Sequence, residues 1–381
     1  MNPNSTTSPQ LFLVAKTYHG LEPVLAEELK QIGAQNIEEQ KRAVTFEGDL
    51  ATLYRANMYL RTAIRVLVNI SEAQVRTEHD LYRSIFRLPW ENYMKLGQTL
   101  AVDAVVGSHI FRHSHFVALK TKDAIVDRFR KKFKQRPSVD LKNPHLRVHI
   151  NLQGDQLKVL LDSSGDSLHR RGYRSLKHPA PLSEALAAGM LLKSGWDQQA
   201  PLLDPMCGSG TIPIEAALIA RNIAPGLIRK KFGFLKWPDL DKGLWQSVKN
   251  EALGKANKDV FDIRGRDFRA EFVDMGRRHA DMAQVNDTLT FTSADFHQAA
   301  APDTPGMLIV NPPYGERLAP EDLADFYKGI GDQLKQQYKG WQAWVLSSNI
   351  KALKKIGLRA SRNIILFNGP LECRFARYDM Y

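Results

Sequence analysis

The stretch Leu202-Leu203-Asp204-Pro205-Met206-Cys207-Gly208-Ser209-Gly210-Thr211 decides the fold of this chain. Two leucines that end a predicted strand lead into Asp204, a glycine-rich turn follows, and residues 211–221 are typical of a helix. Glycine adopts positive φ and lets the backbone approach a ligand, and a helix N-terminus offers free N–H groups to a carboxylate. We therefore predict a strand–turn–helix unit that binds a carboxylate-bearing ligand, through Gly208 and Gly210, at the end of its strand.

This turn differs from two other glycine-rich signatures. Pro213 stands where the dinucleotide fingerprint has its third glycine, and no Gly-Lys-Ser/Thr follows as it would in a P-loop. S-adenosylmethionine fits better, because it has a carboxylate for the helix N-terminus and an ammonium group that Asp204 could meet. A glycine-rich turn without any ligand stays open as the alternative.

Outward from this motif, predicted strands alternate with helices. Ser183 can cap a helix that runs to Lys193. Further strands are expected at residues 260–264, 289–293, 307–310 and 343–347. Such alternation predicts an α/β fold with a doubly wound, mostly parallel sheet, in which ligands bind outside the carboxyl ends of the strands.

Two more acids follow predicted strands. Asp267 could accept hydrogen bonds from both ribose hydroxyls of the cofactor, and Asp295 could accept one from the adenine amino group. Each acid alone could equally be a turn or cap residue, but their placement at successive strand ends favours the cofactor. Pro181, ahead of the first helix, and Met206, within the turn, are further candidate cofactor contacts.

The sequence Asn311-Pro312-Pro313-Tyr314 follows the strand at 307–310. An exocyclic amine on an aromatic ring is a poor nucleophile, because its lone pair is delocalised into the ring. The Asn311 side-chain oxygen and the Pro312 backbone oxygen could accept the amine hydrogens and direct the lone pair at a methyl group. Tyr314 could stack on the base, and the prolines stiffen the loop. Together with Asp204 this predicts methyl transfer to a ring amine of a base taken out of its stack.

The N-terminal half predicts two smaller α+β units. Gly154-Asp155 between alternating strands at 146–152 and 156–161 indicates a hairpin. A turn-rich stretch at 163–166 favours a boundary there. We predict domains at residues 1–70, 71–163 and 164–381.

The charge indicates a polyanionic partner. The formal net charge is +12, and residues 120–147 hold ten Lys or Arg against three Asp. A solvated helix face is the alternative for this run, and an ion pair with Glu316 is the alternative for Arg317. The candidate RNA contacts are Lys122, Arg128, Arg130, Lys131, Lys132, Lys134, Arg136, Arg170, Arg171, Arg174 and Arg317.

Other classes of protein are not favoured. Only two cysteines are present, and one lies in the cofactor turn, so we expect no disulfide framework and a reducing, cytoplasmic setting. Residues 1–10 lack a signal-peptide pattern, and the apolar stretch 185–192 is too short to span a bilayer. No metal site and no obligate protein partner is indicated.

The chain resembles the bacterial ribosomal RNA guanine-N2 methyltransferases. The similarity lies in residues 202–217, Ala224-Pro225-Gly226, Trp237 and the run from Asn311 to Leu318. Residues 122–127 and 136–140 are similar to the THUMP portion of that family, and residues 164–174 to its junction with the catalytic domain.

The resemblance implies a ferredoxin-like unit, a THUMP unit and a class I, Rossmann-like methyltransferase domain with a seven-stranded, mostly parallel sheet. The implied substrate is a guanine of 23S rRNA near the peptidyl transferase centre, as naked RNA or in a large-subunit assembly intermediate, and the product is N2-methylguanosine. Some relatives carry a second methyltransferase domain, and here we expect the form with one. Relatives often have another acid where Phe268 and Arg269 follow Asp267, which leaves the details of the ribose contact open.

Four alternatives remain from the sequence. The same fold and loop could methylate a tRNA guanine, the N6 amine of adenine in a nucleic acid, or a protein glutamine, although the long basic N-terminal half argues against the last. From a different class, the chain could be a non-catalytic RNA-binding ribosome assembly factor.

Overall fold

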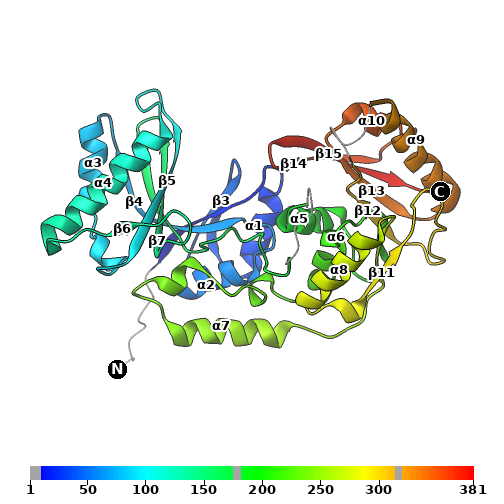
Figure 1. Cartoon of the computed structure of the whole chain (residues 1–381), viewed down its shortest axis with the longest axis horizontal. Coiled ribbons are helices and arrows are strands. Elements are labelled where there is room, and N and C mark those ends of the chain that lie inside the picture. Colours follow the sequence, from blue (N-terminus) through cyan, green and yellow to red (C-terminus); the bar gives the residue numbers. More distant parts are fainter. Residues whose placement is uncertain (1–9, 175–181, 314–319) are drawn as a thin grey trace.

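The computed structural model describes residues 10–174, 182–313 and 320–381. Its strands form two sheets, which lie along the long axis of an elongated molecule with the N-terminal half at one end and the C-terminal half at the other (Figure 1). In these three ranges no helix combines the length and the apolar character needed to cross a lipid bilayer.

The N-terminal unit has strands with one buried face. Leu13 and Ala15 of β1 are buried, whereas Phe12, which precedes Leu13, is 58% exposed and Val14 between them is partly exposed, which is the period of two of a strand. β1 pairs antiparallel with both β3 and β4. The elements are β1 (Leu11–Lys16), α1 (Glu22–Gln31), β2 (Gln35–Gln40), β3 (Ala43–Gly48), α2 (Leu50–Tyr59) and β4 (Arg65–Gln74).

The second unit continues the same sheet. β4 pairs with β1 on one side and with β8 on the other, so the predicted boundary at residue 70 falls inside a strand that both units share. The predicted hairpin is confirmed, because β7 and β8 are antiparallel across Gly154. The strand order is β2-β3-β1-β4-β8-β7-β5-β6. The further elements are α3 (Glu78–Arg87), the 3-10 turn η1 (Trp90–Asn92), β5 (Thr99–Gly107), α4 (Ser114–Phe133), β6 (Ser138–Val139), β7 (Leu146–Gln153) and β8 (Gln156–Asp162).

The C-terminal half is a doubly wound sheet of seven strands in the order β11-β10-β9-β12-β13-β15-β14. The pairs from β11 to β13 are parallel and only β15 runs against its neighbours, which confirms the predicted mostly parallel sheet. Its elements are α5 (Glu184–Ser194), β9 (Leu202–Asp204), α6 (Thr211–Ala220), η2 (Pro225–Leu227), η3 (Gly233–Lys236), α7 (Lys242–Lys255), β10 (Ile263–Asp267), α8 (Ala270–Met282), η4 (Asn286–Thr288), β11 (Leu289–Ser293), β12 (Met307–Val310), α9 (Pro320–Gln337), β13 (Gln342–Ser347), α10 (Ile350–Lys354), β14 (Arg362–Asn368) and β15 (Leu371–Asp379).

This sheet has a separate hydrophobic core on each face. One core joins the strands to α5, α6 and α8, for example through Met190, Ile214 and Val273. The other joins them to α9 and α10, for example through Ile330 and Leu353. The helices therefore cover both faces, and the carboxyl edge of the parallel strands remains as the place for a ligand.

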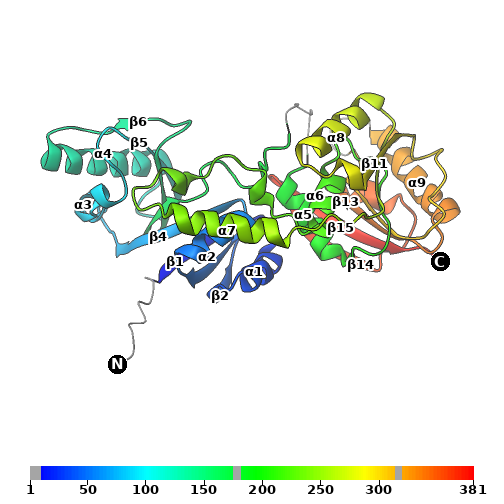
Figure 2. The same ribbon diagram turned by 90° about the horizontal axis from the view of Figure 1, so that it is seen from below.

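A segment of the C-terminal half returns to the N-terminal sheet. Phe234 of η3 stacks on Tyr54 of α2 with ring centroids 4.7 Å apart, and Val248 of α7 is part of the N-terminal core. Figure 2 shows α7 running beside α2, away from the C-terminal sheet. The two halves of the chain are thus packed together by apolar contacts and not only by a linker.

The start of α5 makes a second link between the halves. Ser183 lies at the predicted N-cap, but its hydroxyl makes no capping hydrogen bond. It accepts a hydrogen bond from the Tyr18 hydroxyl at 3.0 Å instead. The capping prediction is therefore wrong for the side chain, because the Ser183 hydroxyl bonds to Tyr18 of the N-terminal unit and not to a backbone N–H of α5.

Candidate active site

The glycine-rich turn lies at the point where the order of the C-terminal sheet reverses. β9 pairs with β10 on one side and with β12 on the other, and the turn connects it to α6. Gly208 has φ 52° and Gly210 has φ 82°, both in the left-handed region. A Cβ on Gly210 would come within 2.9 Å of the Phe291 ring. The turn therefore requires glycine, and it brings the N-terminus of α6 to the end of β9.

Asp204 and Asp267 lie at the ends of neighbouring strands and are both buried, at 2% and 6% exposure. The Asp267 carboxylate accepts hydrogen bonds from the backbone N–H groups of Gly208, at 2.9 Å, and Arg269, at 3.0 Å. Asp204 accepts one from Met206 N at 3.2 Å. Burial raises the pKa of Asp204 well above its usual value, and the charge of Asp267 adds to the rise. A cationic group beside Asp204 would favour its charged form.

Asp295 follows β11, the next strand along the same edge. Its carboxylate accepts a hydrogen bond from the His297 backbone N–H at 3.0 Å, and its side chain is partly exposed. The acids that end β9 and β10 and the acid that follows β11 thus lie in the order of three adjacent strands, as the sequence predicts. The geometry fits a ligand that extends along the sheet edge from the helix N-terminus.

Asn311 comes directly after β12, the neighbour of β9 on the opposite side from β10. Its Oδ1 atom is buried and has no hydrogen-bond partner among the residues that the structure describes. Buried polar atoms are normally paired, so an orphaned acceptor at a strand end indicates a site for a donor that binds there. Pro312 is buried next to it. The predicted site residues Tyr314, Pro181 and Arg317 lie outside the described residues.

Two residues at this edge, Phe268 and Arg269, were not predicted as site residues from the sequence. The Phe268 ring, next to Asp267, is 67% exposed, with the Arg269 guanidinium 5.3 Å from its centroid. An exposed aromatic side chain beside a buried acid is a usual feature of ligand sites. The sequence signal for this aromatic side chain is that Phe268 and Arg269 stand where relatives often have another acid.

Six of the predicted RNA contacts lie on the exposed surface: Arg130, Lys131, Lys132, Lys134, Arg136 and Arg170. A polar cavity of about 590 Å³ lies between α3, α4 and β6, and Lys122, Arg130 and Arg136 are among its lining residues. Arg128 is different, because it is paired with Glu91 at 2.7 Å and donates to the carbonyls of Phe86 and Arg87. Lys132 is also within 2.7 Å of Glu91.

One predicted RNA contact, Arg171, is wrong, and a second, Arg174, is bonded within the domain. Arg171 is fully buried and paired at 3.3 Å with Glu215, which is also buried, so no phosphate can reach it. Arg174 donates hydrogen bonds to the Thr211 hydroxyl and to the Leu182 carbonyl, inside the domain. Both side chains therefore have structural partners: Arg171 links α6 to the carbonyl of Arg61, and Arg174 links the segment before α5 to the start of α6.

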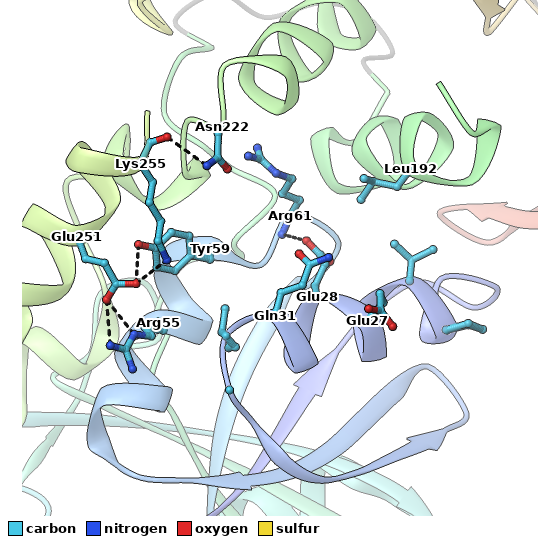
Figure 3. Close-up of a pocket in the computed structure, with 14 residues that line it drawn as sticks. Glu27, Glu28, Gln31, Arg55, Tyr59, Arg61, Leu192, Asn222, Glu251 and Lys255 are labelled. Atoms are coloured by element: carbon cyan, nitrogen blue, oxygen red, sulfur yellow. Dashed lines mark hydrogen bonds and ion pairs between the residues drawn. The ribbon is translucent and has the colours of Figure 1, made fainter. Parts of the chain in front are cut away.

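A larger open cavity lies away from the strand ends. It has a volume of about 800 Å³ and is lined by residues of α1, α2, α5 and α7. Figure 3 shows Glu251 between Arg55 and Lys255, and Glu28 beside Arg61. Glu251 is thus paired with two cations, whereas Glu28 accepts its hydrogen bond from the backbone N–H of Arg61. None of the predicted cofactor residues that the structure describes lines this cavity.

Models of three protein families match the chain in succession. Residues 12–67 match the RlmL ferredoxin-like domain, residues 75–162 match the THUMP domain, and residues 171–377 match the RMKL-like methyltransferase domain. The order agrees with the two units on the first sheet and the doubly wound sheet that follows.

Proteins of known name and known structure are similar over most of the chain. A Synechocystis protein, slr0064, provisionally named as an RNA methyltransferase, is 39% identical, with 99% of this chain and 98% of that protein covered. Ribosomal RNA large subunit methyltransferase K/L of Syntrophotalea carbinolica is 41% identical over 95% of this chain but only 52% of its own length. The chain spans about half the length of the K/L relatives it matches.

The crystal structure of SMU.472, a protein assigned as a methyltransferase and complexed with SAH, superimposes with a TM-score of 0.88. It is 32% identical, and the match covers 98% of this chain and 99% of that one. SAH is the demethylated form of S-adenosylmethionine, so the C-terminal half has the fold of methyltransferases that use this cofactor. With a ferredoxin-like and a THUMP domain ahead of that fold, this chain belongs to the RMKL-like methyltransferase family.

Proposed function

We propose that the protein transfers a methyl group from S-adenosylmethionine to the exocyclic N2 amine of a guanine in 23S rRNA, near the peptidyl transferase centre. The relatives named ribosomal RNA large subunit methyltransferase K/L support an rRNA substrate. The choice of guanine N2 and of this region of the rRNA rests on the sequence resemblance to the guanine-N2 methyltransferases.

The unpaired Oδ1 atom of Asn311 carries the proposal for an amine substrate. It lies after β12, beside β9 and the buried Asp204. An acceptor fixed there would take one amine hydrogen, and the Pro312 carbonyl, set by the rigid ring before Pro313, would take the other. Two acceptors turn the nitrogen lone pair out of the plane of the base. Positioning of this kind can supply roughly 7–11 kcal/mol of the barrier.

The acids along the sheet edge would hold the cofactor. Asp204 would pair with its ammonium group, Asp267 with the ribose hydroxyls and Asp295 with the adenine amino group. The turn at Gly208 and Gly210 leaves room for the carboxylate of the cofactor, which would accept hydrogen bonds from backbone N–H groups. The cofactor supplies the methyl group. The protein residues fix its direction relative to Asn311.

The basic surface of the THUMP domain would hold the RNA. Arg130 and Arg136 line one cavity and Lys131 and Lys134 extend the positive charge along α4 and beyond it. Phosphate contacts of this kind give affinity without reading sequence, so they would set the position of the RNA rather than select the base.

The test is transfer of a labelled methyl group from S-adenosylmethionine to protein-free 23S rRNA, to large-subunit precursors and to tRNA, followed by nucleoside analysis. We expect N2-methylguanosine in 23S rRNA. Transfer to tRNA alone would overturn the rRNA assignment, and N6-methyladenosine would overturn the choice of guanine. RNA binding without any methyl transfer would favour an assembly factor without catalysis.

A further inference from the structure

An ion pair between a partly exposed arginine and a buried glutamate lies against the start of α6, where the glycine-rich turn ends. Arg174 donates a hydrogen bond to the hydroxyl of Thr211, the first residue of α6, and its Nη1 lies 3.5 Å from Oε1 of Glu184 in the first turn of α5. A guanidinium and a carboxylate therefore lie next to the helix N-terminus that faces the predicted cofactor site.

Both members of this pair have atoms without a partner. Glu184 is only 3% exposed, yet within residues 10–174, 182–313 and 320–381 its Oε2 atom has no hydrogen-bond partner, and neither has the buried Nε of Arg174. His279, which is fully buried, approaches the Ser209 carbonyl with Nδ1 at 3.1 Å while its Nε2 is also unpaired. Unpaired buried atoms on both sides of one turn indicate that a bound polar ligand supplies their missing hydrogen bonds.

We propose that Arg174 and Glu184 bind the amino-acid end of S-adenosylmethionine. Arg174, together with the N-terminus of α6, would take the carboxylate, and Glu184 would accept a hydrogen bond from the α-ammonium group. An ammonium group has three N–H donors, so it can serve Glu184 in addition to Asp204 at the other end of the turn. The inference rests on the cofactor of the proposed function and is independent of the RNA substrate.

The charges around Glu184 agree with this assignment. Burial raises the pKa of Glu184 to about 7, Arg174 and Arg171 oppose the rise, and Glu215 of α6 adds to it. Other titratable side chains near the pair are Tyr173, whose hydroxyl donates to Glu215, His279 of α8, and His169, which is close enough to feel the charge of Arg174. An ammonium group beside Glu184 favours the ionised carboxylate, so the affinity for the amino-acid end should rise as the pH increases through 7.

The test is isothermal titration calorimetry with two ligands, SAH and 5′-methylthioadenosine, which keeps the adenosine and the sulfur but lacks the amino-acid end. In Glu184→Gln and Arg174→Gln we expect the Kd for SAH to rise at least tenfold and that for methylthioadenosine to change less than twofold. Glu251→Gln, which removes an ion pair with Arg55 remote from the turn, is the matched control and should bind both ligands like the wild type.

Unchanged SAH affinity in both variants would overturn the proposal. An equal loss of both ligands would also overturn it, because it would reveal a purely structural role for the pair. Arg174→Lys keeps the positive charge and should recover part of the SAH affinity, with thermal melting as the check on folding. Since no RNA is present, these outcomes leave the rRNA assignment unaffected, whereas a wild-type protein that binds no SAH would contradict the proposed function itself.

Discussion

At the scale of single residues, Asn311 is the side chain on which the proposed chemistry depends. Its buried Oδ1 atom would accept a hydrogen bond from the reacting amine, and that bond matters most while the methyl group moves. We expect Asn311→Ala to lower kcat about 100-fold or more, as removal of one fixed partner of the reacting group does in other enzymes. The Kd for SAH should stay within about twofold of the wild-type value, since Asp204, Asp267 and the turn remain.

Single-turnover kinetics with saturating RNA, and calorimetry with SAH, would measure the two quantities separately. Asn363→Ala, at an exposed position of β14, is the control and should leave both unchanged. Wild-type turnover in Asn311→Ala would mean that the loop after β12 does not hold the amine.

Glu184 also predicts how stability depends on pH. Its pKa in the folded protein is raised to about 7 by burial, whereas an exposed glutamate has its usual value of 4.5. Between pH 4.5 and pH 7 the folded state holds a proton that the unfolded state has released. The contribution of Glu184 to the free energy of unfolding is therefore fully present below pH 4.5 and is lost as the pH rises to 7. Glu184→Gln removes the titration, and its free energy of unfolding should fall less steeply than that of the wild type in this window.

The difference in slope should be at most about 1.4 kcal/mol per pH unit, the value for one proton. Urea unfolding of both proteins at pH 5, 6, 7 and 8, without ligand, would measure it. Parallel profiles for the two proteins would show that the carboxyl group titrates normally and is not desolvated.

Arg171 shows why residue roles were harder to predict than motifs. In the sequence it stands in a basic run, which predicts an RNA contact because arginine side chains are mostly exposed. Its acid partner, Glu215, is 44 positions further along the chain, and only the packing of α6 brings the two together. Asp204, Asp267, Asp295 and Asn311 were placed correctly at strand ends because their positions follow from the strands that precede them.

At the scale of elements, α4 and the segment after it form the basic face of the THUMP domain. Arg136 is exposed and lines the 590 Å³ cavity, whereas Arg128 is held by Glu91. We expect Arg136→Ala to weaken RNA binding and to reduce the slope of log K against log salt by roughly one, the effect of one lost phosphate contact. The kcat at saturating RNA should stay near the wild-type value.

Fluorescence anisotropy with labelled RNA from 50 to 300 mM salt would measure the slope. Lys258→Ala is a charge-matched control, because Lys258 precedes β10 and so lies at the amino edge of the sheet, opposite the cofactor site. An unchanged slope in Arg136→Ala would place the RNA on another surface.

Elements with strong local patterns were predictable, and elements defined by distant partners were not. The hairpin of β7 and β8 and the strands β11, β12 and β13 were found from alternation and apolar runs. β10 was placed too early, because its last residues, Arg266 and Asp267, are charged and do not continue the apolar pattern of a strand. The charged β2 was not predicted, since its pattern of exposed residues is that of an edge strand paired only with β3.

At the scale of the whole molecule, the three domains are joined by contacts that no single sequence pattern indicates. The β4 strand makes one sheet from the ferredoxin-like and THUMP units, and η3 and α7 fix the methyltransferase domain to that sheet. A third contact lies between β1 and α1, where Gly20 meets β14. These contacts would fix the distance between the basic surface and the end of β12.

Gly20 provides a test of that third contact. It has φ +91°, and a Cβ at this position would come within 2.5 Å of the Ile365 backbone oxygen. Gly33 has a similar φ of +83° but nothing lies within 4 Å of its would-be Cβ, so Gly33→Ala measures the cost of the backbone conformation alone. We expect Gly33→Ala to lose about 1 kcal/mol of unfolding free energy, and Gly20→Ala to lose at least about 2 kcal/mol more because the backbones must also separate. Chemical denaturation followed by tryptophan fluorescence would measure both. Equal losses in the two variants would mean that the N-terminal unit does not press against β14 in solution, and the distance between the RNA surface and the catalytic loop would then be free to vary.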